Sequence, residues 1–525
     1  MSARLETLCT ITRTSNCSDA VDQRLMDYAL SGDMTQLSKS RFLSGLQCPL
    51  KLWYDVHNRE LATPPDETKQ AIFDRGTAIG ELAQQRWPGG ELVGFRPWER
   101  ETAIAETRTL MADPTIPAIY EAAIEHRGVF IRVDILARND DGWDLVEVKA
   151  SASPEKAVFQ NDVAVQHWVA TGAGLAIRQA GILVLNRDYI YPGGEYDLDE
   201  LFTFFDSTEQ CLSAAGRIEE DVDRLHATLG ADAPPEIGIG DHCFTPYDCP
   251  YYAHCSRDAV FPEHPIGNLH RLHHARRAQL EAMGVETIAE IPNDFPLNDT
   301  QQRIRKAVLT GRPWQSDQLQ QALSNVDWPL YYLDFEAFQP ALPLFPGTRP
   351  FQAIPFQYSL HIEHEDGRLE HVEYLHTENT DPRLALARSL LDAIGNRGSI
   401  VVYSSYERRM LNELAQACPE RASELTALID RLWDLLPVIQ QHYYHPDFNG
   451  SFSIKAVLPA LVPDSGWSDM AISDGMAAAA AYERALQDCN GIEARQIFAE
   501  LCEYCHMDTK AMVDLRHELL RLAVN

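Results

Sequence analysis

The sequence contains no apolar run long enough to cross a membrane, since its longest run of small apolar residues, 477–481, is far short of the roughly 20 residues required. Residues 1–19 mix Arg, Glu, Thr and Ser and include no apolar core of a secretory signal. Basic residues are few, with 45 Lys and Arg against 77 Asp and Glu, which gives a formal net charge of -32. We therefore expect a soluble cytoplasmic protein without a membrane segment. Strong non-specific binding to duplex nucleic acid is not expected, because a phosphate polymer is repelled by a negative field.

The chain is long enough for several hydrophobic cores, because 525 residues exceed the size at which one core keeps growing. Hydrophobic residues make up 45% and charged residues 23%, which is typical of folded globular protein. Eleven cysteines in a cytoplasmic chain favour metal ligation over a disulfide framework wherever they gather. Three of them gather in the segment HCFTPYDCPYYAHC, which holds Cys243, Cys249 and Cys255.

A first acidic constellation lies in the segment 128–151, where alternating apolar residues and a turn at 139–142 predict a β-hairpin. Asp134 lies on its first strand, and Glu147 and Lys149 lie two apart on the second, so these two share a face. Two carboxylates can hold a hard divalent cation, and a nearby ammonium can orient water and offset charge on a scissile phosphate. By itself, Glu-x-Lys is common on solvated strands, so the chemical interpretation depends on its neighbours. A helix from about 154 to 170 follows and carries Asp162 and Gln166.

A second constellation begins in YYLDFEAF, where Asp334 and Glu336 again lie two apart on a predicted strand. Glu407 stands at the start of a helix, and Tyr504 and Asp508 lie at i and i+4 on a late helix, hence on one face. Asp334 and Glu336 by themselves predict a metal site with two carboxylates. His506 points roughly 160° away from Asp508 around the helix and is expected on the surface. Asp434, in RLWDLL, is a spare acidic candidate, more often a surface carboxylate on a helix.

The first constellation resembles the PD-(D/E)xK fold of RecB-like nucleases, including the CRISPR-associated members. That resemblance implies that Asp134, Glu147 and Lys149 are catalytic, that Gln166 lines the site, and that Mg²⁺ or Mn²⁺ is bound there. Many RecB-like enzymes have a metal-binding His in an early Gly-x-x-x-His-Glu pattern, whereas this chain reads GTAIGE with Gly80 in the His position. Glu81 remains as a candidate ligand or as a solvated helix carboxylate.

The cysteines resemble those of AddB-type and CRISPR-associated nucleases, in which one Cys precedes the nuclease core and three follow it. The resemblance implies a [4Fe-4S] cluster held by Cys48, Cys243, Cys249 and Cys255. The family often has Cys-x2-Cys where this chain has Cys-x5-Cys, so structural zinc, with His242 or His254 as further ligands, is the alternative, and unligated buried cysteines are a third. Either metal centre would connect residue 48 to residues about 200 positions later in the chain, which suggests that the centre has a structural role.

The second constellation resembles the DEDD exonucleases of the ribonuclease-H-like fold, with Tyr504 where their water-positioning Tyr lies and Glu407 where Asp is usual. The stretches FPGTRPFQAIPFQYSLH, YYHPDFNGSFSIKAVLPAL and EYCHMDTKAM are similar to a bacterial family labelled domain of unknown function 2779. The resemblance covers about 300–525. It implies two divalent metals on Asp334, Glu336, Glu407 and Asp508 and removal of nucleotides from 3′ to 5′.

We therefore predict an α/β protein with an N-terminal arm (1–36), a RecB-like domain with its cysteine cluster (37–258), a helical linker (259–325) and a ribonuclease-H-like domain (326–525). The linker resembles one helix-hairpin-helix unit at LEAMGVETIAEI and equally fits a plain helical connection. The expected activity is metal-dependent hydrolysis of nucleic acid, with single-stranded DNA as substrate. The alternatives are RNA processing, a nucleic-acid-binding scaffold with lapsed sites, and an iron-sulfur redox protein.

Overall fold

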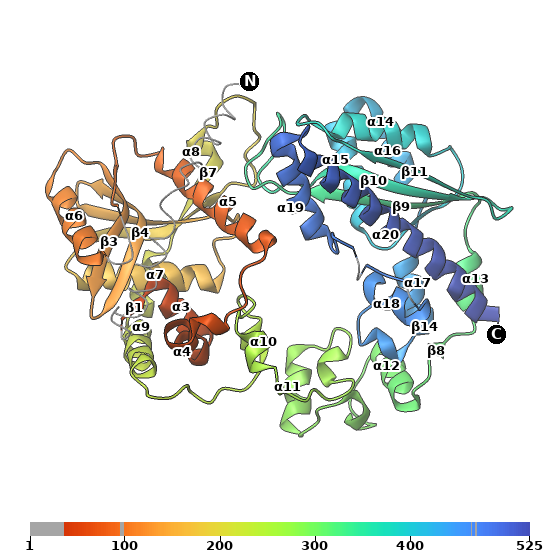
Figure 1. Ribbon diagram of the computed structural model, residues 1–525, viewed down its shortest axis with the longest axis horizontal. Helices are drawn as coiled ribbons and strands as arrows, with labels where there is room; N and C mark the ends of the chain where they lie inside the picture. Colours follow the sequence, from red (N-terminus) through yellow and green to blue (C-terminus); the bar gives the residue numbers. More distant parts are fainter. Residues whose placement is uncertain (1–35, 95–98, 464, 468–469, 525) are drawn as a thin grey trace. The chain divides into compact units, whose positions relative to one another are not determined.

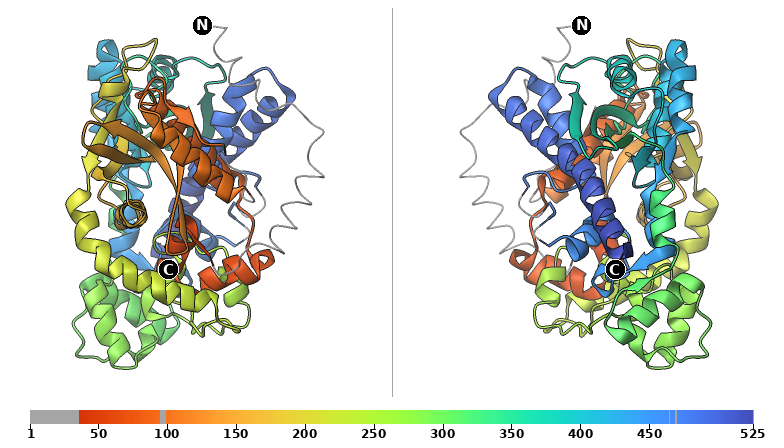
Figure 2. Two further views of the ribbon diagram at one scale, coloured as in Figure 1. Left: turned by 90° about the vertical axis from the view of Figure 1, so that its left-hand side faces the viewer. Right: turned by 90° about the vertical axis from the view of Figure 1, so that its right-hand side faces the viewer.

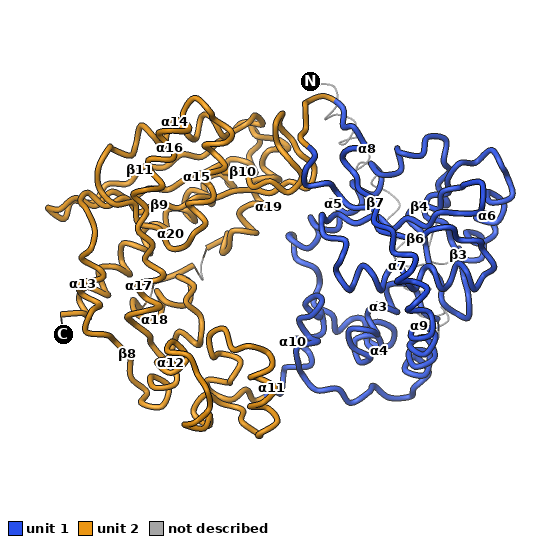
Figure 3. Tube along the Cα trace, turned by 180° about the vertical axis from the view of Figure 1, so that it is seen from behind, with its two compact units in different colours: residues 1–189, 195–259 blue, residues 190–194, 260–525 orange. Residues whose placement is uncertain are grey.

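The computed structural model describes residues 36–94, 99–463, 465–467 and 470–524. The expected arm, apart from its last residue, lies outside the described residues, as do Cys9 and Cys17. The chain divides into two compact units, shown in two colours in Figure 3. The first unit comprises residues 1–189 and 195–259, and the second comprises residues 190–194 and 260–525. Each unit has its own hydrophobic core.

The first unit is built on a seven-stranded mixed sheet in the order β2-β3-β4-β5-β6-β7, with β1 pairing in parallel with β4. Strands β1, β3, β4 and β7 of this sheet are labelled in Figure 1. The expected hairpin is confirmed, because β4 and β5 pair antiparallel with Asn139 opposite Gly142. The parallel pair β5 and β6 is joined by α7. The strands are β1 (Leu37–Ser38), β2 (Glu91–Leu92), β3 (Ala118–His126), β4 (Val129–Asn139), β5 (Gly142–Lys149), β6 (Ile177–Leu185) and β7 (Phe202–Asp206).

Helices flank this sheet, and two of them follow β1 in direct succession. Ser38 caps the first, accepting a hydrogen bond from Arg41 N, and the chain is extended at Cys48 before Pro49 starts the second. Proline fits the first turn of a helix because it lacks the N–H that would have no partner there. The helices of the first unit are α3 (Lys39–Gln47), α4 (Pro49–His57), α5 (Glu67–Gln84), α6 (Arg100–Ala112), α7 (Ala157–Gly172), α8 (Leu198–Leu201), α9 (Thr208–Leu229) and α10 (Tyr252–Cys255), with 3₁₀ turns η1 (Arg59–Leu61) and η2 (Asp241–Cys243).

The second unit contains a five-stranded sheet in the order β11-β10-β9-β12-β13. β10 runs antiparallel to β9 and β11, whereas β12 is parallel to β9 and to β13. A short separate pair is formed by β14 and β8. The strands are β8 (Trp314–Gln315), β9 (Leu330–Phe338), β10 (Ile354–Glu363), β11 (Leu369–Leu375), β12 (Ile400–Val402), β13 (Leu432–Asp434) and β14 (Tyr443–Tyr444).

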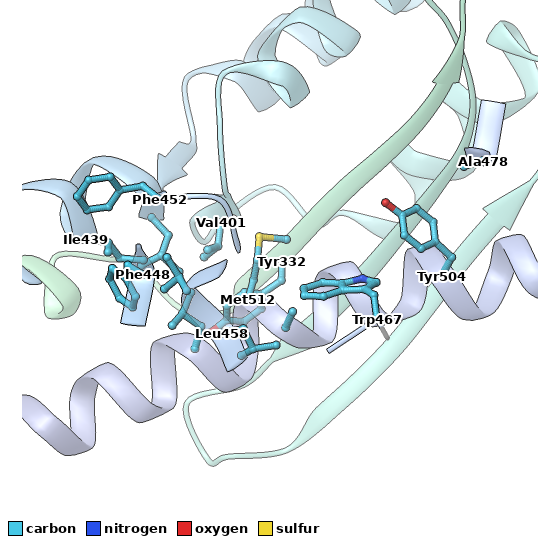
Figure 4. Packing of buried hydrophobic residues seen from close by; sticks show 14 of the residues in the cluster. Tyr332, Val401, Ile439, Phe448, Phe452, Leu458, Trp467, Ala478, Tyr504 and Met512 are labelled. Carbon is cyan, nitrogen blue, oxygen red and sulfur yellow. The ribbon is translucent and has the colours of Figure 1, made fainter. Parts of the chain in front are cut away.

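Two cores cover the faces of this sheet, because successive side chains of a strand point to opposite sides. On β9, Leu333 and Phe335 pack into the core with α14, α15 and α16, while Tyr332 packs into the core that includes α20. Figure 4 shows part of this second core, with Trp467 and Tyr504 at one end. The 33-residue α20 is visible as the long dark-blue helix in Figure 2.

The helices of the second unit are α11 (His274–Ala282), α12 (Asp299–Thr310), α13 (Leu319–Ser324), α14 (Arg383–Ala393), α15 (Tyr406–Ala417), α16 (Ala422–Ile429), α17 (Leu435–His442), α18 (Ile454–Leu461), α19 (Gly475–Ala485) and α20 (Ile492–Val524). Its 3₁₀ turns are η3 (Ile266–Asn268), η4 (Ile288–Glu290), η5 (Pro419–Arg421), η6 (Pro446–Phe448) and η7 (Leu486–Asp488). The region 265–312 contains two helices, α11 and α12, joined through η4. Among the described helices, none combines the length and apolar character needed to cross a membrane.

Candidate active sites

The structure brings together four of the residues expected in the first constellation. Asp134 on β4 and Glu147 on β5 meet Lys149, whose Nζ donates to Glu147 Oε1 at 2.6 Å. From α7, Gln166 Nε2 donates to Glu147 Oε2 at 2.6 Å. Asp162, one turn earlier on α7, forms an ion pair with Lys149. We call this group, together with Lys39, the Glu147 cluster.

Lys39 is the residue of this cluster that the sequence pattern did not identify. It is the first residue of α3, and its Nζ donates to Glu147 Oε1 at 2.9 Å and Oε2 at 3.1 Å. It also lies 3.3 Å from Asp162 Oδ1. The parallel pairing of β1 with β4 brings the start of α3 to the sheet. The contact between Lys39 and Glu147 depends on this long-range pairing, so no local sequence pattern predicts it. Glu81, by contrast, is exposed on α5 and is not among the hydrogen-bonded partners of Glu147.

The Glu147 cluster includes two lysines, whose positive charges stabilise its carboxylates. Burial alone would raise the pKa of Glu147, but Lys149 and Lys39 outweigh burial and hold that pKa below its usual range. Burial would likewise lower the pKa of Lys39, but Asp162, Glu147 and Asp134 raise it well above the usual value. Asp134 differs, because burial and then the charge of Glu147 raise its pKa to about 8. Glu147 is therefore ionised and paired with two ammonium groups.

The four cysteines singled out in the sequence line one cavity of about 20 Å³. Cys48 lies between α3 and α4, Cys243 ends η2, and Cys255 ends α10. The loop between them is closed by a hydrogen bond from Cys249 N to Cys243 O of 2.8 Å. Burial raises the pKa of the Cys255 thiol, and the other three cysteines raise it further, as expected for four neighbouring sulfur atoms.

The cysteine cavity also contains a histidine. Cys243 Sγ lies 3.7 Å from His242 Nε2, so one of the alternative nitrogen ligands is beside the sulfur atoms. Within the described part of the chain, groups of three ligand atoms within 4.8 Å of one another are formed by three histidines and by three carboxylates, and the cysteines do not form one.

The second constellation forms what we call the Asp334 cluster, consisting of Asp334, Glu336, Glu407 and Asp508. Carboxylate oxygens of Asp334, Glu336 and Asp508 lie within 4.8 Å of one another. Asp334 and Glu336 project from β9 on the face that α20 covers, and α20 supplies Asp508. Glu407 lies in the first turn of α15, is 3% exposed, and accepts a hydrogen bond from Ser404 Oγ at 3.4 Å.

Negative charge accumulates in this cluster, in contrast to the Glu147 cluster. Burial and then Asp508 raise the pKa of Asp334 and of Glu336 well above the usual value. Burial raises the pKa of Glu407 to about 8, and that of Asp508 to about 7 although Lys455 opposes the shift. Four buried carboxylates near one lysine favour either protonation or a divalent cation.

Tyr504 lies one turn before Asp508, as the i and i+4 spacing predicted, and both residues are buried. Its hydroxyl accepts a hydrogen bond from Lys455 Nζ at 3.0 Å. Lys455, in the first turn of α18, also donates to Ser473 O. Because the phenolic oxygen accepts from Lys455, the hydroxyl hydrogen is directed toward another acceptor. Lys455 lies inside the family-like stretch of the sequence, but its role depends on the packing of α18 against α20.

The raised carboxyl pKa values predict a pH dependence of stability in the metal-free protein. The folded chain retains protons on Asp508 and Glu407 that the unfolded chain, with carboxyl pKa values of about 4, has released. The free energy of unfolding therefore falls as pH rises from about 4 to 8, and a cation bound to the ionised carboxylates offsets this loss. We expect Mg²⁺ to raise the melting temperature more at pH 8 than at pH 6, measured against EDTA at each pH. The prediction is wrong if Mg²⁺ raises the melting temperature equally at pH 6 and pH 8. It is also wrong if Asp508→Asn shows the same difference between the two pH values as the unchanged protein.

Two further expectations concern His506 and Asp434. His506 is exposed, as expected, but its ring packs against His361 and His371, with ring centroids 4.8 and 4.3 Å away. Asp434 ends β13 and caps α17 by accepting a hydrogen bond from Leu436 N at 3.0 Å, so it is a half-buried cap and not a surface carboxylate within a helix. Burial raises its pKa.

Comparison with known proteins confirms part of the family resemblance. The family model described as Domain of unknown function (DUF2779) matches residues 331–453. This stretch runs from β9 through η6 and includes Asp334, Glu336 and Glu407, whereas Tyr504 and Asp508 lie beyond it. Uncharacterized protein MG366 of Mycoplasma genitalium is 26% identical over 208 residues, which are 35% of this chain and 31% of the relative. The chain thus aligns with about a third of the length of that relative.

Proposed function

We propose that this protein is a metal-dependent nuclease that hydrolyses phosphodiester bonds of single-stranded DNA, with a ribonuclease-H-like 3′ to 5′ exonuclease site in the second unit and a RecB-like site in the first. The observation that carries the proposal is the Asp334 cluster. Three carboxylates whose oxygens lie within 4.8 Å of one another, with a fourth nearby, match the oxygen-rich sites that hard divalent cations prefer.

The sheet of the second unit supports a ribonuclease-H-like assignment. Its order β11-β10-β9-β12-β13, with β10 alone antiparallel to its neighbours, makes a mixed sheet within an α/β unit, the class to which that fold belongs. The carboxylates come from the central strand β9, from the first turn of α15 and from the late helix α20. Single-stranded DNA is preferred over duplex because the chain is strongly acidic.

The residues of the Asp334 cluster fit divalent metal, because burial and mutual repulsion leave them with more negative charge than Lys455 neutralises. Asp334, Glu336 and Asp508 would hold the ions, with Glu407 completing the set. When bound, such ions supply Lewis-acid activation of water and charge stabilisation at the phosphate. Lys455 donates to the oxygen of Tyr504, and the hydroxyl of Tyr504 is hydrogen-bonded to Asp508, so a cation on Asp508 would release that hydroxyl for a water or a phosphate oxygen. Lys455 adds a positive charge that attracts the substrate.

In the first unit, the arrangement of Glu147, Lys149 and Gln166 around one carboxylate supports a RecB-like site. Lys149 could orient water and Gln166 fixes the carboxylate of Glu147. Metal fits this cluster less readily, because both oxygens of Glu147 already accept hydrogen bonds from Lys39. A divalent cation would share Glu147 and Asp134 only after Lys39 withdraws. This favours, for the first unit alone, the alternative of a nucleic-acid-binding module whose catalysis has lapsed.

The variant Lys39→Met tests whether the ammonium group of Lys39 occupies the position that a divalent metal ion would take beside Glu147. In EDTA we expect the variant to lose roughly 3 kcal/mol, because removal of Lys39 from the buried ion pairs leaves Lys149, among the described residues, as the one ammonium group beside Glu147 and Asp162. For a domain of this size that is a fall of about 6–12 °C in melting temperature. Mn²⁺ should restore more of that stability in the variant than it adds to the unchanged protein. Lys69→Met, on an exposed position of α5, is the control and should melt normally. If Mn²⁺ stabilises both proteins equally, the idea is wrong.

The cysteine cavity supports a [4Fe-4S] cluster as the resident cofactor of the first unit. Four cysteines line it, and four thiolates are the usual ligand set of such a cluster. Cys48 comes from the junction of α3 and α4, so the cluster would tie the helix that starts with Lys39 to the segment 243–255. The [4Fe-4S] cluster would then have a structural role, in which it keeps the residues of the Glu147 cluster in place, and not a redox role.

The decisive experiment uses the full chain purified without oxygen. It is incubated with 5′- and 3′-labelled single-stranded DNA and RNA, with Mg²⁺, Mn²⁺ or EDTA, beside Lys149→Ala and Asp334→Asn. We expect metal-dependent cleavage of DNA that disappears in Asp334→Asn, with a ladder of products shortened from the 3′ end. Loss in Lys149→Ala would instead assign the activity to the first unit, and cleavage of RNA alone would make the protein an RNA-processing enzyme. The absence of cleavage of either polymer would refute the proposal in favour of a binding role.

A further inference from the structure

Three histidines meet beside the Asp334 cluster without belonging to it. His361 on β10 and His371 on β11 are direct cross-strand partners in the antiparallel pair. His506 reaches them from α20, and one ring nitrogen of each residue lies within 4.8 Å of the others. We call this group the His361 cluster. The β10–β11 pairing brings His361 and His371 together, and the packing of α20 on the sheet adds His506.

Hydrogen bonds already orient two of the three rings. His361 Nδ1 pairs with Thr509 Oγ1 at 2.8 Å, and His371 Nε2 pairs with Ser359 Oγ at 2.9 Å. In each of these two rings, one nitrogen is hydrogen-bonded to a hydroxyl group, and the other nitrogen takes no part in that bond. Metal-binding histidines have this arrangement, because a partner on the second nitrogen fixes the tautomer and the ring orientation.

The surroundings allow a metal ion to enter and remain. His506 is exposed, which leaves a path from solvent and an open coordination position, while His361 is 3% exposed. The nearby cation Lys510 is engaged by Asp514, with Nζ 2.6 Å from Oδ2. Three imidazoles with an open position form a ligand set suited to zinc and similar transition metals.

We propose that His361, His371 and His506 form a second metal site, selective for Zn²⁺ and related transition-metal ions, that fastens α20 to β10 and β11. The site differs from the Asp334 cluster in donor chemistry, because carboxylate oxygens select hard Mg²⁺ or Mn²⁺ and imidazole nitrogens select Zn²⁺. α20 also carries Tyr504 and Asp508, so an ion on His506 fixes the helix that completes the carboxylate set. The site does not depend on the nuclease proposal, since it is recognised by metal binding alone.

The test is a Zn²⁺ titration of the full chain by calorimetry, with saturating Mg²⁺ to occupy the carboxylates. His506→Gln and His371→Gln are compared with His364→Gln, a histidine of the β10–β11 turn that pairs with Glu370. We expect the unchanged protein and His364→Gln to bind one more equivalent of Zn²⁺ than the other two variants. Affinity at that equivalent should fall by at least about 100-fold, since loss of an outer-shell partner alone costs 10–100-fold.

Two readouts separate this site from the cysteines, which are unchanged in all four proteins. The Co²⁺ difference spectrum between the unchanged protein and His506→Gln should show visible metal bands without sulfur-to-metal charge transfer. Zn²⁺ should also raise the melting temperature of the unchanged protein by several degrees more than that of His506→Gln. Because His506 is exposed, its replacement should leave the fold intact, which circular dichroism verifies. Equal stoichiometry and affinity in the unchanged protein and both variants would overturn the proposal.

Discussion

Asp334→Asn should reduce metal-dependent cleavage by roughly 1,000-fold, equivalent to about 4 kcal/mol in the activation barrier. The substitution keeps the size of the side chain and removes its charge, at a position where oxygens of Glu336 and Asp508 lie within 4.8 Å. Divalent affinity should fall with the rate, because one of three clustered carboxylates no longer ligates. The measurement is single-turnover cleavage of labelled single-stranded DNA across a range of Mn²⁺ concentrations.

A melting experiment distinguishes the loss of a metal ligand from unfolding of the variant as the cause of the lower cleavage rate. The pKa of Asp334 is raised well above its usual value, so a neutral side chain suits the metal-free site and Asp334→Asn should melt at or above the normal temperature in EDTA. Asp392→Asn, on an exposed position of α14, is the matched control and should cleave normally. An active Asp334→Asn variant would place the chemistry outside the second unit.

The largest effect on stability is expected from Cys48→Ala. If a metal centre ties Cys48 to the segment 243–255, its loss releases a loop of about 200 residues, which costs about 5 kcal/mol on the chain-entropy account. The melting temperature should fall by about 10–20 °C, and the iron content of anaerobically purified protein should fall with it.

Cys211→Ala provides the control for this prediction. Cys211 is 1% exposed on α9 in the same unit, so its replacement removes similar buried volume without touching the cavity. It should lose only about 1–2 kcal/mol and retain its metal. Equal losses in the two variants, with equal iron and zinc contents, would show that the four cysteines are packing residues.

Patterns of short range were predictable from the sequence. The β4–β5 hairpin follows from alternation and its turn, and the pairs Asp334/Glu336 and Tyr504/Asp508 follow from the periods of strand and helix. The break between α3 and α4 is also a short-range feature, because the extended Cys48 precedes Pro49, which fits the first turn of a new helix.

By itself, the sequence determined the candidate functional residues: the carboxylates at i and i+2, the tyrosine one turn before an aspartate, and the three grouped cysteines. Tertiary structure alone decided which of these residues act on one another and what charge they retain. Lys39 reaches Glu147 across 108 positions and supplies the charge that lets it stay ionised, whereas Asp334 lies among acidic neighbours and Lys455 reaches Tyr504 from another helix. The reason is that period and propensity are local, while burial and Coulomb interaction depend on distance in space, which the packing of helices on a sheet sets.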